Sequence, residues 1–85
     1  MTHSKEISST NELNLHRKRL IYISQYLKQL RLYEGLTQIE ASSMIGISRN
    51  SLQNAEHGHN TTLTTIFKIV DFYELSIAEF FIDAE

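Results

Sequence analysis

The residue types and spacing that suggest a chemical role lie in one segment, Gln38 to His57. Gly46 sits near its middle, where a tight turn needs a φ above zero that a side chain would resist. Ser42 comes four residues earlier and is small enough to let a second helix cross closely. Ser48 follows the turn, and its hydroxyl can cap a helix start by accepting a hydrogen bond from an unpaired amide. Two short helices with polar residues on one outer face would meet there, a pattern that indicates DNA reading.

An enzyme is the first alternative, and the sequence gives it little support. Serine, histidine and acidic residues are present, but none lies in a nucleophile elbow, a phosphate-binding glycine loop or another recognisable catalytic setting. His57 and His59 suggest a metal site, yet two loop histidines do not complete one, and the spacing of His3 and His16 does not finish it. We expect no catalytic residue, no metal and no cofactor, and interpret the histidine pair as loop or phosphate-facing residues.

The bulk composition narrows the class of protein. A chain of 85 residues is expected to form one domain with a small core. Hydrophobic residues make up 41% and charged residues 21%, as in soluble globular domains. No apolar run approaches the ~20 residues that cross a bilayer, and no signal-peptide core follows the start, so we expect a cytoplasmic protein without a membrane partner. The chain has no cysteine, so its stability must come from packing.

Charge is distributed unevenly along the chain, although the net charge is only −2. Residues 14–49 hold six basic and two acidic side chains, whereas residues 50–85 hold one basic and six acidic side chains. One end of the domain could therefore face phosphate while the other repels it. The cluster Arg17, Lys18 and Arg19 has two interpretations that the sequence leaves open, a phosphate contact or an exposed solubilising group.

Helical periodicity begins after a polar stretch. Residues 1–13 are polar and are expected to form a flexible arm, which leaves 14–85 as the domain. The first helix should begin between Glu12 and Arg17 and end at Glu34. Its core line is Leu20, Ile23, Leu27 and Leu30. A second line, about 90° around the same helix, is Leu15, Tyr22, Tyr26 and Tyr33. This second line is either an edge of the core or a surface for a partner or a second copy.

Caps locate the helices that follow. Thr37 and Glu40 form a capping box that opens a helix at about Gln38, and the next helix should run from about Arg49 to about Glu56. Its obvious core contacts are Leu52 and Ala55. The apolar surface of the helix before it is Ile39, Ala41, Met44 and Ile45.

Two more helices complete the expected all-α, compact five-helix bundle. Thr61 or Thr62 caps the fourth, whose apolar residues are Leu63, Ile66, Phe67, Val70 and Tyr73. Ser76 and Glu79 form a second capping box and open a short last helix. No strand signal and no internal repeat is found.

The segment Leu36 to His57 resembles the XRE, or Cro/CI-type, helix-turn-helix family of lambda-repressor-like DNA-binding domains. The likeness extends over about Ile23 to Phe81. Its most specific residues are Leu36-Thr37-Gln38, Ile45-Gly46-Ile47-Ser48, and Glu56 with Gly58. The resemblance implies a lambda-repressor-like bundle with its helix-turn-helix at about 38–57. It also implies an ion pair between Arg31 and Glu56.

The resemblance further implies a sequence-specific transcriptional regulator, a repressor that reads the major groove of double-stranded operator DNA with the helix at about 49–56. The base-reading positions would be Arg49, Asn50, Gln53 and Asn54. Arginine can bond guanine O6 and N7, and Asn or Gln can pair with adenine N6 and N7. The phosphate-contacting positions would be Gln38, Ser48, Ser51, His57, Asn60 and Thr61.

The same resemblance suggests partners. A homodimer is expected, formed in solution or only on DNA, in a prokaryotic cytoplasm and on the nucleoid when bound. The alternative is an antitoxin or small protein-interaction module of a toxin-antitoxin or mobile-element operon, with DNA binding as autoregulation. Its toxin or other protein partner would dock on the second line of the first helix, described above, or on Phe80, Phe81 and Ile82.

Four positions depart from the family's usual residues, and one of them is Thr61, where the family usually has a proline before the fourth helix. The family usually has Leu in place of Ala41, Ala in place of Ser42 and a larger aliphatic residue in place of Ala55. The packing between the two helices of the motif therefore loses methylene groups. We expect Met44, Phe67 or a slight closing of the helices to fill the gap.

Overall fold

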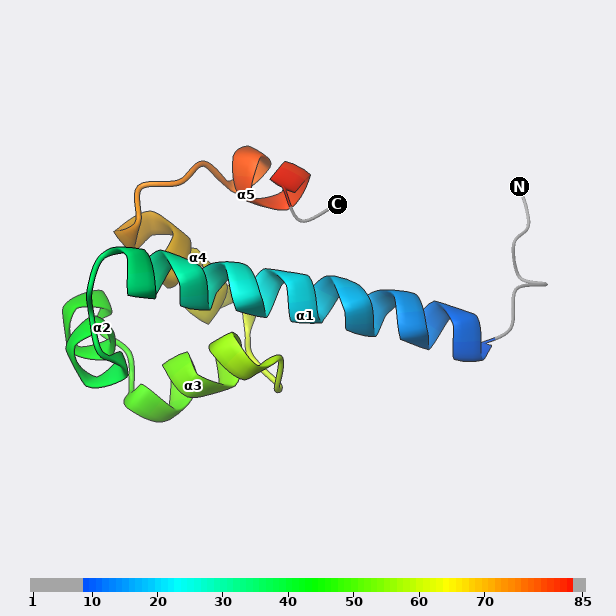
Figure 1. Ribbon diagram of the computed structural model, residues 1–85, viewed down its shortest axis with the longest axis horizontal. Helices are drawn as coiled ribbons and strands as arrows, with labels where there is room; N and C mark the ends of the chain where they lie inside the picture. The colour runs from blue at the N-terminus through cyan, green and yellow to red at the C-terminus, as the bar shows by residue number, and fades with distance from the viewer. Residues whose placement is uncertain (1–8, 84–85) are drawn as a thin grey trace.

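A computed structural model of the chain describes residues 9–83, with side chains described for residues 14–80. Every regular element in this range is an α-helix (Figure 1). The helices are α1 (Ser9–Tyr33), α2 (Gln38–Ile45), α3 (Arg49–His57), α4 (Leu63–Phe72) and α5 (Ile77–Asp83). None of these helices is both long and apolar enough to span a bilayer. The expected all-α five-helix architecture is confirmed.

Helix α1 is the long element against which the others pack. Its carboxyl-terminal half lies among α2 to α5, and its amino-terminal half projects beyond them (Figure 1). It begins at Ser9, earlier than the expected window from Glu12 to Arg17, so residues 9–13 of the expected arm are helical. Residues 1–8 of that arm lie outside the described range. At the other end Gly35, with a φ of 72°, follows the last turn.

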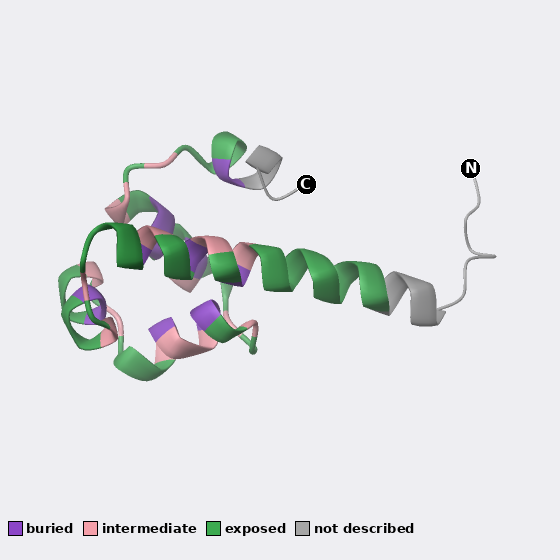
Figure 2. Cartoon of the chain, viewed as in Figure 1, coloured by how far each residue is buried: buried purple, intermediate pink, exposed green. Residues whose placement is uncertain are grey.

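The core is formed where helical periodicity brings one face of each helix inward. Its buried members are Leu27, Ala41, Leu52, Ala55, Ile66, Ile69, Val70 and Phe80. In Figure 2 the buried parts of α3 turn toward α1 and α4. Burial of these apolar side chains offsets the conformational entropy that the chain loses on folding. Ile69 was not among the expected core residues, although it is fully buried.

Several apolar side chains take positions that differ from the expectation. Met44 is 59% exposed, and Ile39 and Phe67 are also exposed, so neither Met44 nor Phe67 fills the space left by Ala41 and Ala55. Both alanines are nevertheless buried, within the core cluster that includes Leu27, Leu52 and Ile66.

Helix α5 is held to α1 by an aromatic contact. The rings of Phe80 and Tyr26 meet edge to face, with their centroids 5.5 Å apart. Phe80 is completely buried, so the expected docking surface at Phe80, Phe81 and Ile82 is wrong for its first residue. The side chains of Phe81 and Ile82 lie outside the described residues.

Candidate nucleic-acid interface

The helix-turn-helix is built from caps that lie close together in the sequence. Thr37 Oγ1 accepts a hydrogen bond from the Glu40 amide at 3.1 Å, and the Thr37 amide donates to Glu40 Oε1 at 2.9 Å. Hydrogen bonding to the exposed Glu40 carboxyl from the Thr37 backbone amide, and then from the Thr37 side chain, lowers the pKa of that carboxyl. Helix α2 ends at Gly46, whose φ is 87° and whose amide donates to the Ser42 carbonyl at 2.9 Å. The capping box expected here is confirmed.

Helix α3 has a fixed start and a fixed stop. Ser48 Oγ accepts a hydrogen bond from the Ser51 amide at 3.0 Å and donates to Ser51 Oγ at 2.9 Å. Gly58, with a φ of 72°, terminates the helix, and its amide donates to the Asn54 carbonyl. A Cβ at Gly58 would lie 3.4 Å from Ser24 Oγ, so the loop after α3 runs directly against α1. A nine-residue helix is marginal alone, and these contacts hold it in place.

A hydrogen-bonded carboxylate ties three helices together. Arg31 Nε of α1 donates to Glu56 Oε2 of α3 at 2.8 Å, and Gln38 Nε2 of α2 donates to Glu56 Oε1 at 3.2 Å. Arg31 Nη1 also donates to the Leu36 carbonyl at 2.8 Å. The side chains of Arg31 and Glu56 are 8% and 0% exposed, so the expected ion pair is present and sealed from solvent. It fixes the angle of α3 against α1 and α2.

The outward face of α3 remains free. Leu52, Ala55 and Glu56 turn inward, which leaves the opposite side of the helix open within the described chain (Figure 2). The proposed base-reading residues divide by exposure, with Arg49 and Asn50 exposed and Gln53 and Asn54 half-buried. None of these four side chains is sealed inside the molecule.

The candidate phosphate-contacting residues differ in exposure. Ser48, His57 and Asn60 are exposed, whereas Gln38, Ser51 and Thr61 are half-buried. The amide group of Gln38 carries two hydrogens, and the bond to Glu56 occupies one of them. The Ser48 hydroxyl donates to Ser51, so Ser51 holds the hydroxyl hydrogen that is still available in this pair. Thr62, rather than Thr61, caps α4 by accepting from the Thr65 amide at 3.1 Å.

Two features of the site could not be read from the sequence. The Gln38 bond to Glu56 joins residues 18 positions apart, and the Arg31 bond to the Leu36 carbonyl bridges a loop. No local pattern signals either contact.

The rings of His57 and His59 lie 6.0 Å apart at the end of α3, and the described residues contain no group of three or more side chains able to hold a metal ion.

Curated proteins with similar sequences include antitoxins. The chain is 41% identical over 56 residues to the antitoxin HipB of Escherichia coli, covering 65% of this chain and 64% of HipB. It is 40% identical over 48 residues to the antitoxin PezA of Streptococcus pneumoniae, covering 56% of this chain and 30% of PezA. The chain therefore spans less than two thirds of the length of each of these relatives.

Solved structures with a similar fold include restriction-modification controller proteins. C.AhdI from Aeromonas hydrophila aligns with a TM-score of 0.63 and 27% identity, over 72% of this chain and 94% of its own. Wild-type C.Esp1396I aligns with a TM-score of 0.65 and 25% identity, over 78% of this chain and 88% of its own. A mutant of C.Esp1396I bound to its highest affinity operator site aligns with a TM-score of 0.66.

A family model described as helix-turn-helix matches residues 27–80, which is more than half of the chain. The match covers the capped α2 and α3, the buried ion pair and the α4 and α5 packing. The chain belongs to the XRE, or Cro/CI-type, helix-turn-helix family, a family of DNA-binding regulators and not of enzymes.

Proposed function

We propose that this protein is a sequence-specific regulator of transcription that represses from a double-stranded operator, with α3 in the major groove. The observation that carries the proposal is the outer face of α3, where Arg49 and Asn50 are exposed beside a helix start capped by Ser48. A rigid helix with free hydrogen-bonding side chains fits a groove about 12 Å wide. The chain catalyses no reaction, uses no cofactor and acts in the cytoplasm.

Each of the four outward residues of α3 has a base edge that suits it. Arg49 bonds guanine through O6 and N7, and Asn50, Gln53 and Asn54 bond adenine through N6 and N7, each good pair being worth ~1–3 kcal/mol of discrimination. The Asn54 carbonyl accepts the hydrogen bond from the Gly58 amide that ends α3. The buried Glu56 contacts no base and keeps the helix at its reading angle.

Phosphate contacts flank the reading helix and position it. Gln38 offers its second amide hydrogen at the amino-terminal end of α2, where the helix dipole also favours an anion. Ser51 offers its free hydroxyl hydrogen, and Ser48, His57, Asn60 and Thr61 complete the set. Contacts of this kind fix the register on DNA and carry no sequence information.

The regulator acts as a homodimer on a two-fold operator. Members of helix-turn-helix families place two recognition helices about one helical turn apart, ~34 Å, on symmetric half-sites. The similar controller protein C.Esp1396I has been solved on its operator, which supports operator binding by this chain.

A second candidate function is that of an antitoxin whose DNA binding regulates its own operon. The likeness to HipB and PezA favours it. A toxin partner would then bind the chain away from α3. If the product of an adjacent toxin-like reading frame co-purifies with this protein, the antitoxin role is established. DNA binding then remains as autoregulation.

Selection of bound fragments from a random DNA pool, repeated with variants, tests the proposal. Asn50→Ala should relax base preference at one position of the selected site and leave the others unchanged. Ser51→Ala should weaken binding to all sequences by a similar factor. Equal losses on every sequence for both variants, or the absence of a salt-sensitive affinity in the wild type, would refute the proposed division of roles.

A further inference from the structure

Helix α1 carries positive charge that the rest of the described chain does not neutralise. Residues 14–33 contain no acidic residue, and their cations are Arg17, Lys18, Arg19, Lys28 and Arg31. Arg31 pairs with the buried Glu56, whereas no ion pair joins the other four to a described residue. All four are exposed. Unpaired cations gathered on one helix are typical of a surface that binds a polyanion.

The projecting half of α1 starts at the place where α3 ends. A Cβ on Gly58, the residue that stops α3, would lie 3.4 Å from Ser24 Oγ and 3.8 Å from Leu20 Cγ. The exit from α3 therefore rests on the turn of α1 between Leu20 and Ser24, and α1 continues past it (Figure 1). Arg17 precedes Leu20 by three residues, which is about 4.5 Å along the helix at ~1.5 Å per residue.

Helical geometry points the three neighbouring cations of this half in different directions. Helix α1 is unbroken from Ser9 to Tyr33, so each residue advances ~100° around its axis. Arg17 lies about 20° around the helix from Ser24, which faces the exit from α3. Lys18 and Arg19 lie about 120° and about 140° away from Ser24. Arg17 is thus the member of the cluster that lies on the α3 side.

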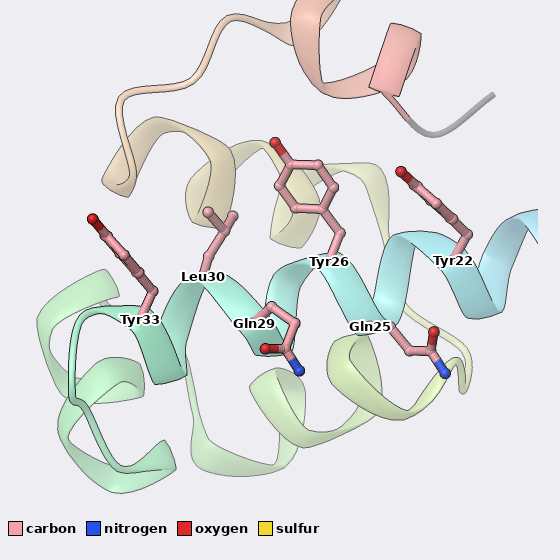
Figure 3. A pocket seen from close by; sticks show the side chains of 6 residues that line it. All are labelled: Tyr22, Gln25, Tyr26, Gln29, Leu30 and Tyr33. Carbon is pink, nitrogen blue, oxygen red and sulfur yellow. The ribbon is translucent and has the colours of Figure 1, made fainter.

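The other side of α1 is a separate surface. There Tyr22, Tyr26 and Tyr33 border an open groove of about 500 Å³, and their rings point away from α3 (Figure 3). Arg19 precedes Tyr26 by seven residues, so it lies about 20° around the helix from that tyrosine. Arg19 consequently matches Arg17 in charge and exposure but not in direction.

We infer that Arg17 binds a phosphate of the operator duplex beyond the base pairs that α3 reads, so that the projecting half of α1 is a second element that holds the DNA backbone. This inference rests on the proposed function, in which α3 occupies the major groove. The exposed His57 and Asn60, at the end of α3 and in the loop after it, are candidate phosphate contacts, and Arg17 lies one turn of α1 further out. Phosphates of one strand follow one another at ~3.4 Å along the duplex, a step similar to that turn. The guanidinium group can bond two phosphate oxygens at once.

The contact would be a property of this chain and not of the whole family. The family model matches residues 27–80, and Arg17 lies before that segment. An acidic protein segment is the other polyanion that exposed cations attract. The direction of Arg17, toward the exit from α3, favours DNA because the same bound duplex can then contact both elements.

Operator titrations at several salt concentrations test the inference. Arg17→Gln should reduce the slope of log affinity against log salt concentration by ~0.9, so its loss of affinity relative to the wild type should grow about 3.5-fold from about 200 to about 50 mM salt. Arg19→Gln is the matched control and should leave the slope unchanged. Arg17→Lys keeps the charge and should also keep the slope. Base preference should be the same in all three variants, because phosphate contacts carry no sequence information.

Neutral methylphosphonate linkages, placed one at a time along the flank of the selected operator, locate the contact. One or two positions outside the selected base pairs should weaken wild-type binding but not that of Arg17→Gln, since a contact that is already absent cannot be lost again. Equal slopes for Arg17→Gln and Arg19→Gln, or equal losses at every linkage for wild type and Arg17→Gln, would overturn the inference and leave the reading role of α3 intact. A wild type without salt-sensitive affinity for any duplex would overturn the proposed function together with it.

Discussion

Glu56 combines a negative charge with complete burial, and the fold depends on how that charge is satisfied. Its two carboxylate oxygens each accept a hydrogen bond, one from Arg31 and one from Gln38. Removing an ionised group from water costs free energy unless well-placed hydrogen-bond partners replace the lost hydration. Glu56 therefore contributes mainly by fixing which arrangement of α1, α2 and α3 is allowed.

We expect Glu56→Ala to lower the free energy of unfolding by about 3–5 kcal/mol, because it leaves Arg31 buried without its counter-charge. Chemical denaturation measures this change. Asp71→Ala, at an exposed position of α4, is the control and should alter stability by less than about 0.5 kcal/mol. A melting curve for Glu56→Ala that overlaps the wild type would rule out the structural role assigned to the ion pair.

Tyr73 presents the opposite case, a buried polar atom without compensation. Its hydroxyl is enclosed and finds no hydrogen-bond partner within the described residues. Burial raises the pKa of Tyr73 above 10.0, and the nearby charge of Glu56 raises it further, while Arg31 acts in the other direction. The folded state thus prefers the neutral phenol. Stability from this preference is complete below the unfolded pKa and is lost as pH rises through the folded pKa.

Tyr73→Phe should consequently keep or raise stability at neutral pH, by up to about 1 kcal/mol, since it removes an unpaired buried hydroxyl. The difference in stability between the variant and the wild type should grow above pH 10, because unfolding of the wild type then lets the Tyr73 phenol ionise, whereas Phe has no proton to lose. Thermal melting of both proteins across this pH range tests the idea. A variant that is clearly less stable at pH 7 would show that the hydroxyl has a partner in solution.

At the scale of the element, α3 depends on a single cap at its start. Ser48→Ala should destabilise the fold by about 1 kcal/mol through loss of the bond from the Ser51 amide. Ser43→Ala, on the exposed side of α2, is the control. Ser48→Asp should preserve stability, because Asp also caps helices, but should weaken operator binding by placing a carboxylate beside the DNA backbone. Equal operator affinity for Ser48→Asp and the wild type would place Ser48 away from phosphate.

Helix ends were predictable where the signal is local. Thr37, Ser48 and Gly58 each act within a few residues, so the sequence located α2 and α3 to within one residue. The start of α1 was not predictable, because residues 9–13 carry no apolar periodicity and their helix extends one that is already formed. The hydrogen bond from Gln38 to Glu56 depends on the packing of two helices.

Side-chain burial was less predictable than helix position. Met44 and Phe67 satisfy the helical period but lie outside, whereas Ile69 lies inside. In a helix of eight to ten residues, several apolar positions fit the same stripe, and only tertiary packing selects among them. The assignment of bases and phosphates to individual residues stays a prediction that the variants above address.

At the scale of the molecule, the basic residues gather toward one end of the chain and the acidic residues toward the other. Arg17, Lys18 and Arg19 are all exposed on the projecting half of α1, and the carboxyl-terminal part is acidic. This separation of charge turns the basic part of the protein toward a polyanion, although the net charge of the protein is negative.

Replacing Arg17, Lys18 and Arg19 together by Gln should reduce the slope of log affinity against log salt concentration by up to about 3, since each phosphate contact adds ~0.9 to that slope. Operator titrations at several salt concentrations measure it. Lys68→Gln, at an exposed position of α4, controls for a general change in net charge. An unchanged slope for the triple variant would assign the cluster to solubility alone.

Gly46, in the turn of the helix-turn-helix, and Gly58, after its second helix, differ in the space around them. The space beside Gly46 is open to 4 Å, so asparagine, which tolerates a left-handed backbone, can stand there. Gly58 has the same backbone handedness, but a Cβ there would already contact Ser24 Oγ at 3.4 Å and Leu20 Cγ at 3.8 Å, so a longer side chain has less room than at Gly46. Both positions strain an ordinary side chain through their left-handed backbone, but only at the exit from α3 does the neighbouring helix also limit the size of the residue.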